Sequence, residues 1–285
     1  MFVAAVLLAA APLRAQSHLT LDAILDWTHP AAWFGGLSGI EVMPDGQRAL
    51  IISDRGALIV AELSREADHL TDVTLRSRRP LKHRNGQELR GVRRDAEGLA
   101  LHTNGEAFVT FEHQHRLARL DLAKQLTAPL PGPDAFSGFP KNGGLEALAI
   151  HPDGTLFMLA ESGHENSPTI PVYALEYDRW FIQTEITRDP IFAPVGADFD
   201  RNGQLYLLER ATSLLGFRSR IRLIDLFTSP TRERVLLTSA PGFFDNLEGL
   251  SVWTDSQGKT RLTLVSDDNF LPVQKTQIVE FIVNE

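Results

Sequence analysis

Acidic residues stand at both ends of a hairpin pattern that recurs along this 285-residue chain. In the copy from Leu145 to Glu161, Glu146 opens an apolar run, Asp153-Gly154 supplies a turn, and Glu161 closes a second apolar run. Residues equidistant from the turn of an antiparallel hairpin lie opposite each other. We therefore expect the two carboxylates at the same open end of the hairpin, where they can bind a cation or transfer protons.

The hairpin pattern occurs five times. Its copies are Leu37–Arg55, Ala96–Glu112, Leu145–Glu161, Val195–Arg210 and Leu247–Asn269. They recur roughly every 50 to 60 residues, which is the period of one four-stranded propeller blade. Since no long amphipathic helix appears, we expect an all-β fold: a single β-propeller of five blades, or six if one interval contains a degenerate blade.

The chain ends suggest how the ring closes and where the protein goes. The strand-like run Leu19–Asp26 is expected to complete the last blade, because closure removes an exposed sheet edge. Residues 2–12 are apolar but too short to span a bilayer, and Ala15 is a small residue of the kind that precedes a cleavage site. We expect a signal peptide at 1–15, a propeller domain at 16–285, and a periplasmic or secreted protein without stable membrane insertion after cleavage. An N-terminal anchor is the alternative.

The composition limits the kinds of molecule that this protein is expected to bind. The formal net charge of −8 argues against nucleic-acid binding, which needs a basic surface. The chain has no Cys, so neither disulfides nor thiolate metal ligands are available. We expect a monomer that acts on a small anionic or ester substrate, and an anionic substrate would need local cations to approach.

The open ends of the hairpins should gather many acids around one channel mouth. The expected set is Glu97, Glu112, Glu146, Glu161, Glu248, Asp267 and Asp268, with Ser38, Asp54, Arg55, Glu209 and Arg210 from the first and fourth copies. Crowded carboxylates must be protonated, paired with arginine or bound to a cation. Oxygen ligands favour Ca²⁺. Alternatively, each Glu accepts backbone hydrogen bonds from the next blade and only fastens the ring.

A basic segment precedes the second copy. Residues 76–94 contain seven arginines and one lysine, and they lead into Glu97. We expect this segment on the acidic face, where Arg84, Arg93 and Arg94, together with His115, would bind an anionic substrate. An ordinary solvated basic loop is the alternative. In the same interval, the Pro/Gly-rich stretch 129–133 stands where a clear fourth strand is expected.

Several of these segments together resemble the bacterial family described as "esterase-like activity of phytase". The resemblance rests on LSGIEVMPDG, RRDAEGLA, NGGLEALA, LLERATSLLGFRSRIR and DNLEGLSV with LVSDDNF. It implies an exported, propeller-like protein with recurring Glu and Asp at its active centre. Those acids would correspond to Glu97, Glu112, Glu146, Glu161, Glu209, Glu248, Asp267 and Asp268. Ser38 and Val195 stand where the other copies have Glu, so the acidic ring is incomplete.

The leading hypothesis is a Ca²⁺-dependent hydrolase of phosphoesters. The metal would be held by Glu97, Glu146 and Glu248, assisted by Asp267 and its neighbour Asp268. Glu112 or Glu161 would act as general base, and Arg55 and Arg210 would stabilise developing charge. One alternative is hydrolysis of a carboxylic ester or lactone at the same site. The other is a non-catalytic propeller that binds a ligand or a protein.

Overall fold

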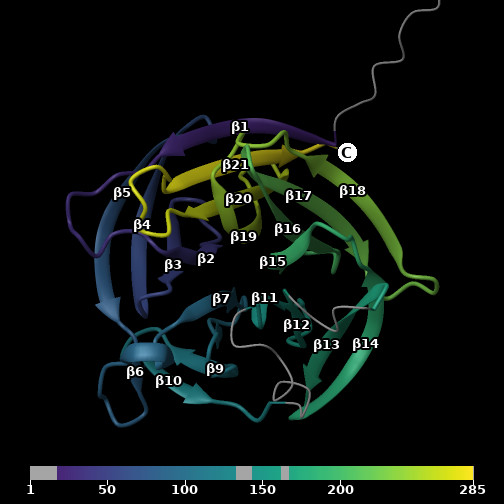
Figure 1. The fold of residues 1–285 in the computed structure, drawn as a ribbon, viewed down its shortest axis with the longest axis horizontal. Coiled ribbons are helices and arrows are strands. Elements are labelled where there is room, and N and C mark those ends of the chain that lie inside the picture. Colours follow the sequence, from purple (N-terminus) through teal and green to yellow (C-terminus); the bar gives the residue numbers. More distant parts are fainter. Residues whose placement is uncertain (1–17, 133–142, 162–166, 285) are drawn as a thin grey trace, which may run out of the picture.

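The computed structural model describes residues 18–132, 143–161 and 167–284. Its strands form five sheets that are arranged as blades around a central axis (Figure 1). The innermost strands are β2 (Leu37–Val42), β7 (Ala96–Leu101), β11 (Leu145–Ile150), β15 (Ala193–Phe199) and β19 (Asn246–Thr254). Each contacts the innermost strands of both neighbouring blades. The all-β prediction is confirmed, with five blades rather than six.

The outer strands follow in chain order within each blade, and blades are numbered here from the N-terminal hairpin. Blade 1 continues with β3 (Arg48–Ser53), β4 (Ala57–Glu66) and β5 (His69–Pro80). Blade 2 continues with β8 (Ala107–Phe111), β9 (Arg116–Asp121) and β10 (Leu126–Pro129). Blade 3 continues with β12 (Leu156–Ala160), β13 (Thr169–Glu176) and β14 (Arg179–Thr187). Blade 4 continues with β16 (Leu205–Ser213), β17 (Gly216–Asp225) and β18 (Arg232–Thr238). Blade 5 continues with β20 (Thr260–Asp267) and β21 (Gln277–Val283).

The N-terminal strand closes the ring, as predicted. Strand β1 (Leu19–Asp26) pairs antiparallel with β21, so that Leu19 lies opposite Val283 and Asp26 opposite Gln277. In Figure 1 the purple strand β1 runs along the outer edge of the yellow strand β21. Blade 5 is thus built from both ends of the described chain, which joins the first and last blades without an interruption in the ring.

The five inner hairpins share one turn geometry. In each of them a glycine amide donates to the carbonyl three residues earlier, as Gly154 does to His151 at 2.8 Å and Gly46 to Met43 at 2.8 Å. Gly154 has φ +95, a conformation that a residue with a Cβ rarely adopts. The Asp-Gly and Asn-Gly pairs that mark the repeat are therefore turn residues, as their composition indicates.

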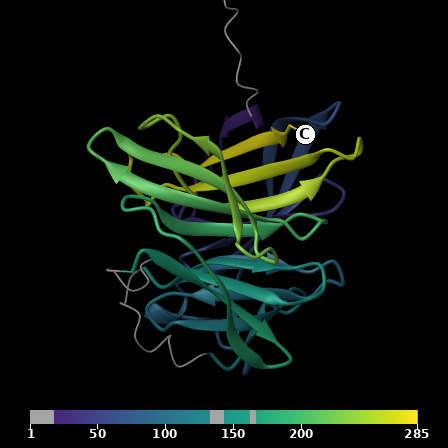
Figure 2. The ribbon, with the colours of Figure 1, turned by 90° about the vertical axis from the view of Figure 1, so that its right-hand side faces the viewer.

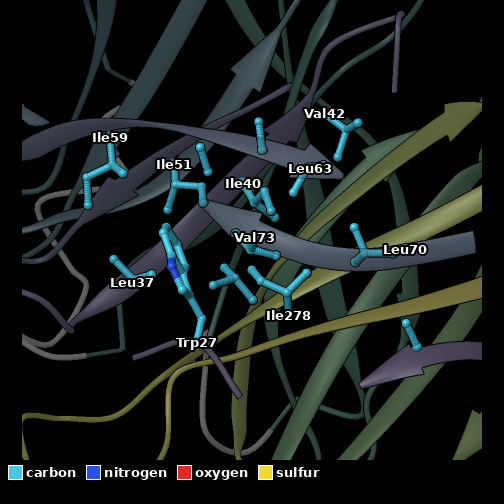
Figure 3. Packing of buried hydrophobic residues seen from close by; sticks show 14 of the residues in the cluster. Trp27, Leu37, Ile40, Val42, Ile51, Ile59, Leu63, Leu70, Val73 and Ile278 are labelled. Atoms are coloured by element: carbon cyan, nitrogen blue, oxygen red, sulfur yellow. The ribbon is translucent and has the colours of Figure 1, made fainter. Parts of the chain in front are cut away.

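Hydrophobic side chains fill the interfaces between neighbouring blades. The cluster between blades 1 and 5 contains Leu37 and Ile40 from β2, Ile278 from β21, and Trp27 from the segment after β1 (Figure 3). Four further clusters occupy the other blade interfaces in the described part of the chain. Figure 2 shows the twisted sheets of blades 4 and 5, in green and yellow, above those of blades 2 and 3, in teal.

Two details of the predicted fold are wrong. The second blade does have a fourth strand, β10, which is short, and β6 (Lys82–His83) pairs parallel with its outer edge. The basic segment is not one loop, because residues 76–80 extend β5, where Arg76 pairs with Glu62. Residues 1–15, the predicted signal peptide, lie outside the described part of the chain. No helix in the described ranges is long and apolar enough to cross a membrane.

Candidate functional site

An acidic cavity of about 280 Å³ lies at the open ends of the inner hairpins. Its lining residues are Ser38, Asp54, Asp95, Glu97, Glu112, Gly143, Glu146, Glu161, Arg210, Glu248, Asp267 and Asn269. All five blades contribute to this set. Eight members are carboxylates, whereas one is a guanidinium, so the cavity is formally strongly negative. The structure therefore brings together most of the acids that the repeat pattern placed at one face.

A β-bulge in each innermost strand sets one residue out of the strand pairing, and in four of the five blades this residue lines the cavity. The pairing register shifts at Leu37/Gly39, Ala96/Leu99, Leu145/Ala147, Pro194/Gly196 and Leu247/Gly249. A bulge leaves an extra residue out of the ladder and re-aims its side chain. Ser38, Glu146, Val195 and Glu248 are the skipped residues in their blades, and Glu97 lies within the wider bulge of blade 2. The same local irregularity, repeated around the axis, thus builds the ring.

Small residues after the bulges let the inner strands approach closely. A Cβ on Gly196 would lie 2.4 Å from the carbonyl oxygen of Glu248, and one on Gly98 would lie 2.7 Å from that of Glu146. Such contacts are too short for a real Cβ, so side chains at these positions would push neighbouring blades apart. The glycines keep the channel neck narrow and hold the ring carboxylates close to one another.

Burial and mutual repulsion raise the pKa values of the ring glutamates. The pKa of Glu97 is raised well above its usual value by burial, and also by the charges of Glu248, Asp95 and Glu112. Burial and the charge of Glu161 raise the pKa of Glu146 in the same way. Burial raises the pKa of Glu248 to about 8, although Arg210 opposes the shift. At neutral pH Glu248 therefore retains its proton unless a cation neutralises it.

The aspartates of the cavity behave similarly. Burial and the charges of Asp267 and Asp95 raise the pKa of Asp54 to about 7. Burial raises the pKa of Asp267 to about 6, although its carboxylate accepts a hydrogen bond from the Asn269 amide at 2.7 Å. Elevated proton affinity in a shared cavity is a property of functional sites. It marks this cavity as the candidate site.

Arg210 neutralises one side of the cavity. Its Nη2 donates to Oε1 of Glu161 at 2.8 Å, and its Nη1 donates to Oδ1 of Asn246 at 2.9 Å and to Oε1 of Glu248. Asn246 in turn donates to Oε1 of Glu248 at 2.8 Å. Arg210 therefore orients two of the predicted functional acids, Glu161 and Glu248, as well as adding positive charge.

The opposite side of the cavity, on blades 1 and 2, contains an imidazole. Nδ1 of His113 lies 2.7 Å from Oδ2 of Asp95 and 3.6 Å from Oε2 of Glu112. Oε1 of Glu112 accepts hydrogen bonds from the amides of Gly143 and Gly144. Neither Asp95 nor His113 is among the site residues that the repeat pattern predicts. The position of Asp95, immediately before the second inner strand, is a signal that could have found it.

Some predicted site residues lie elsewhere. Glu209 is fully buried on the other side of β16, where it accepts hydrogen bonds from Arg220 at 2.6 Å and from Arg222 at 2.7 and 2.9 Å. Because strand side chains alternate between faces, Glu209 cannot share the direction of Arg210. Asp268 does not line the cavity. It accepts the amides of Gly36 at 3.1 Å and Phe270 at 3.0 Å, and so ties the β20–β21 connection to blade 1.

The predicted cationic residues are dispersed. The Arg55 guanidinium stacks 3.1 Å from the ring centre of Phe270 and donates to the carbonyl of Ala32 at 3.2 Å, outside the cavity lining. Arg84 lies beside the Asn104-Gly105 turn, at the other end of blade 2. It does not join the acidic face, because the chain reverses after β6.

Arg93 and Arg94 do reach the cavity side, because helix η1 (Gly91–Arg93) leads directly into Asp95. The charge of Arg94 lowers the pKa of Asp54 and of Asp95, against the larger effect of burial. The carbonyl of Arg93 accepts a hydrogen bond from Arg116. His115 packs against Gly144, since a Cβ on that glycine would lie 2.0 Å from its ring.

A different set of residues fastens the inner strands. Glu41 accepts the amide of Leu101 in the next blade at 3.1 Å, Asp198 accepts the amide of Val252 at 2.6 Å, and Ser251 accepts the amide of Val42 at 2.9 Å. Each lies three residues beyond the ring position of its strand. Hydrogen bonds between neighbouring inner strands, which the sequence analysis considered for the ring glutamates, are therefore made by other residues, three positions further along each strand.

The cavity residues fit a hard divalent cation. All the acidic donors are oxygens, and Ca²⁺ takes six to eight oxygen ligands. Oγ of Ser38 and Oδ1 of Asp54 are buried without a hydrogen-bond partner among the described residues, and both residues line the cavity. Buried oxygens without hydrogen-bond partners, beside carboxylates without a counter-charge, indicate a site for a cation. Glu97, Glu146 and Glu248, with Asp267, are the residues that could hold it.

Comparison with known protein families gives an assignment. The sequence profile described as "Phytase-like: Esterase-like activity of phytase" matches residues 32–270, which is most of the chain. The chain belongs to this family. The match includes every residue of the acidic cavity, and it confirms the resemblance that the repeated segments indicated. A comparison with curated proteins finds no match.

Comparison with solved structures finds matches at low identity. A PQQ-bound aldose sugar dehydrogenase from Streptomyces coelicolor is 13% identical, with a TM-score of 0.48, over 94% of this chain and 99% of that one. A virginiamycin B lyase from Staphylococcus aureus is 11% identical, with a TM-score of 0.44, over 93% and 100%. A gluconolactonase from Xanthomonas campestris is 17% identical, with a TM-score of 0.44, over 86% and 72%.

Proposed function

We propose that this family member is an exported, Ca²⁺-dependent hydrolase that acts on small phosphoesters as a monomer. The observation that carries the proposal is the convergence of eight carboxylates on one cavity, where a single guanidinium lies among the described lining residues. The ion would be held by Glu97, Glu146 and Glu248, assisted by Asp267. The family description supports the esterase-like class, and the metal and the phosphoester are our inference from the cavity.

Residues around the ring have distinct tasks in this proposal. Bound Ca²⁺ would supply a Lewis acid for a phosphoryl oxygen and for the attacking water. Glu161 acts as general base, because Arg210 fixes its carboxylate at 2.8 Å on the cavity wall. Glu112 is the other candidate base, but its Oε1 accepts the Gly143 and Gly144 amides. Arg210 places positive charge where negative charge develops during the reaction.

The test is the substitution Glu146→Gln, which keeps the shape of the side chain but removes a ring charge. Turnover of a generic phosphodiester should fall by about two orders of magnitude or more, with the circular dichroism spectrum retained. The Ca²⁺-dependent rise in melting temperature should disappear as well. Glu106→Gln is the matched control, because Glu106 is a half-buried glutamate at the turn end of blade 2, where Asn104 donates to it at 2.9 Å and Arg119 pairs with it. A Glu146→Gln protein with wild-type turnover would contradict the proposal.

Carboxylic esters are the second candidate substrates. Leu214 and Leu215 are exposed at the tip of the β16–β17 hairpin, which continues the strand that carries Arg210. The Gly242 amide donates to the Phe217 carbonyl at 2.8 Å and so holds exposed Phe243 near the same tip. An apolar border suits an uncharged acyl or alkyl group. Activity on a generic ester without activity on a phosphoester would select this candidate.

A further inference from the structure

An imidazole and two carboxylates form a compact group on the blade 2 wall of the cavity. One potential ligand atom from each of Asp95, Glu112 and His113 lies within 4.8 Å of the others. Asp95 and Glu112 line the cavity. Nδ1 of His113 lies 2.7 Å from Oδ2 of Asp95 and 3.6 Å from Oε2 of Glu112. One imidazole nitrogen and two carboxylate oxygens at this spacing can hold a divalent cation.

The backbone holds this group in place. The Gln114 amide donates to the Glu112 carbonyl at 2.5 Å, which forms a three-residue turn with His113 at its centre and φ +58. The Glu112 amide donates to the Asp95 carbonyl at 2.9 Å. Together these contacts reverse the chain after β8 and direct the imidazole back toward the start of β7. The three side chains are therefore placed by local structure and not by chance contact of mobile loops.

Charge is distributed unevenly in the cavity. Arg210 donates to Glu161 and Glu248 on one side. On the other side, Asp54, Asp95, Glu97 and Glu112 have no guanidinium among the described residues lining the cavity. Ser38, whose side chain is 3% exposed, presents an unpartnered hydroxyl to the same cavity. Asp95 and Glu112 thus lie beside the imidazole of His113 and on the side of the cavity away from Arg210.

We propose that Asp95, Glu112 and His113 bind a divalent transition-metal ion, at a site adjacent to the Ca²⁺ ring. Imidazole nitrogen is a ligand for Zn²⁺, Mn²⁺, Co²⁺ and related ions, whereas Ca²⁺ prefers oxygen alone. The cavity then holds two cations of different classes, and Glu161 remains the base. A role of the second ion in catalysis rests on the proposed function, but binding of this ion can be measured without turnover.

The test uses Co²⁺, whose visible absorption reports a nitrogen- and oxygen-ligated site. Metal-stripped full-length protein is saturated with Ca²⁺ and then titrated with Co²⁺. One equivalent of Co²⁺ should bind and give d–d absorption. His113→Ala should weaken that binding by at least about tenfold, and Asp95→Asn should weaken it too. His102→Ala is the matched control, because His102 lies on the same blade at the turn end, where Nε2 is 3.3 Å from the Pro152 carbonyl.

The possible outcomes separate this site from the proposed function. The inference is overturned if wild-type protein binds no Co²⁺ in the presence of Ca²⁺, or if His113→Ala binds it with wild-type affinity and spectrum. The Ca²⁺-dependent melting temperature of His113→Ala should stay near that of wild type, which shows that the variant folds and keeps its ring. Co²⁺ binding without any hydrolysis would support the metal site and contradict only the proposed activity.

Discussion

Replacing Glu248 by Gln should stabilise the metal-free protein and should remove most of the stabilisation that Ca²⁺ gives to wild type. Without a metal, burial raises the pKa of the Glu248 carboxyl from 4.5 to about 8, although Arg210 and Asn246 donate hydrogen bonds to it. A raised pKa means that ionising the group costs more in the folded protein than in the unfolded chain. At about 1.4 kcal/mol for each tenfold change in proton affinity, the cost reaches about 5 kcal/mol once both states are ionised. Gln carries no charge and avoids this cost.

The measurement is the melting temperature at about pH 9, one unit above the raised pKa, where the full cost applies. In EDTA, Glu248→Gln should be more stable than wild type by about 3 to 5 kcal/mol, or roughly 5 to 10 °C for a chain of this size. With Ca²⁺ in hundredfold excess over its dissociation constant, wild type gains about 2.7 kcal/mol or more. The variant, which lacks a ligand, should gain little.

Glu209→Gln is the control for this comparison. Glu209 is also buried, but its carboxylate is satisfied by Arg220 and Arg222. Glu209→Gln should therefore destabilise the protein with and without Ca²⁺, by about 3 to 5 kcal/mol, because it breaks a buried ion pair. If Glu248→Gln were as destabilising as Glu209→Gln in EDTA, Glu248 would be a structural group and the reasoning about the ring would be wrong.

Three further predictions follow from the geometry. Metal-free protein should lose stability as the pH rises from about 5 to about 8. Asp54 and Asp198 keep their protons in the folded state up to about pH 7, but they release them near pH 4 in the unfolded chain. A free energy of unfolding in urea that rises over this range would contradict the raised pKa values of these two groups. Gly196→Ala should lower stability by about 1 to 3 kcal/mol, since its Cβ would lie 2.4 Å from a backbone carbonyl, and an unchanged urea midpoint would show that the inner strands can separate freely. Removal of residues 1–26 deletes β1 and exposes the edge of β21, so the truncated protein should associate in size-exclusion chromatography, whereas removal of 1–15 alone should not.

Local patterns in the sequence were sufficient for the blade architecture. The Asp-Gly and Asn-Gly turns, the apolar runs on either side and their regular recurrence predicted five blades, and the run Leu19–Asp26 predicted the closing strand with the bounds that the structure shows. These features depend on turn chemistry and on alternation within a strand, which are properties of neighbouring residues. The same reasoning placed Glu97, Glu146 and Glu248 in one ring, because equivalent positions of a repeat occupy equivalent places around an axis.

The side chains that surround the ring could not be assigned from spacing alone. Glu209 and Arg210 are adjacent in the sequence, yet the pleat of β16 sends the first into a buried arginine cluster and the second into the cavity. Asp268 follows Asp267, but its carboxylate is used by the Gly36 and Phe270 amides. A shift of one residue along a strand places a side chain on the opposite face. The repeat pattern does not determine this position at the ends of the strands.

The sequence by itself determined the fold, its closure and the end of the propeller where acids gather. Tertiary structure decided which of those acids share a cavity. The outcome depends on the β-bulges and on the close approach of blades at Gly98 and Gly196. It also depends on which carboxylates are paired with arginines or hydrogen-bonded to backbone amides. Long-range contacts of this kind depend on packing between blades, which no local sequence pattern contains.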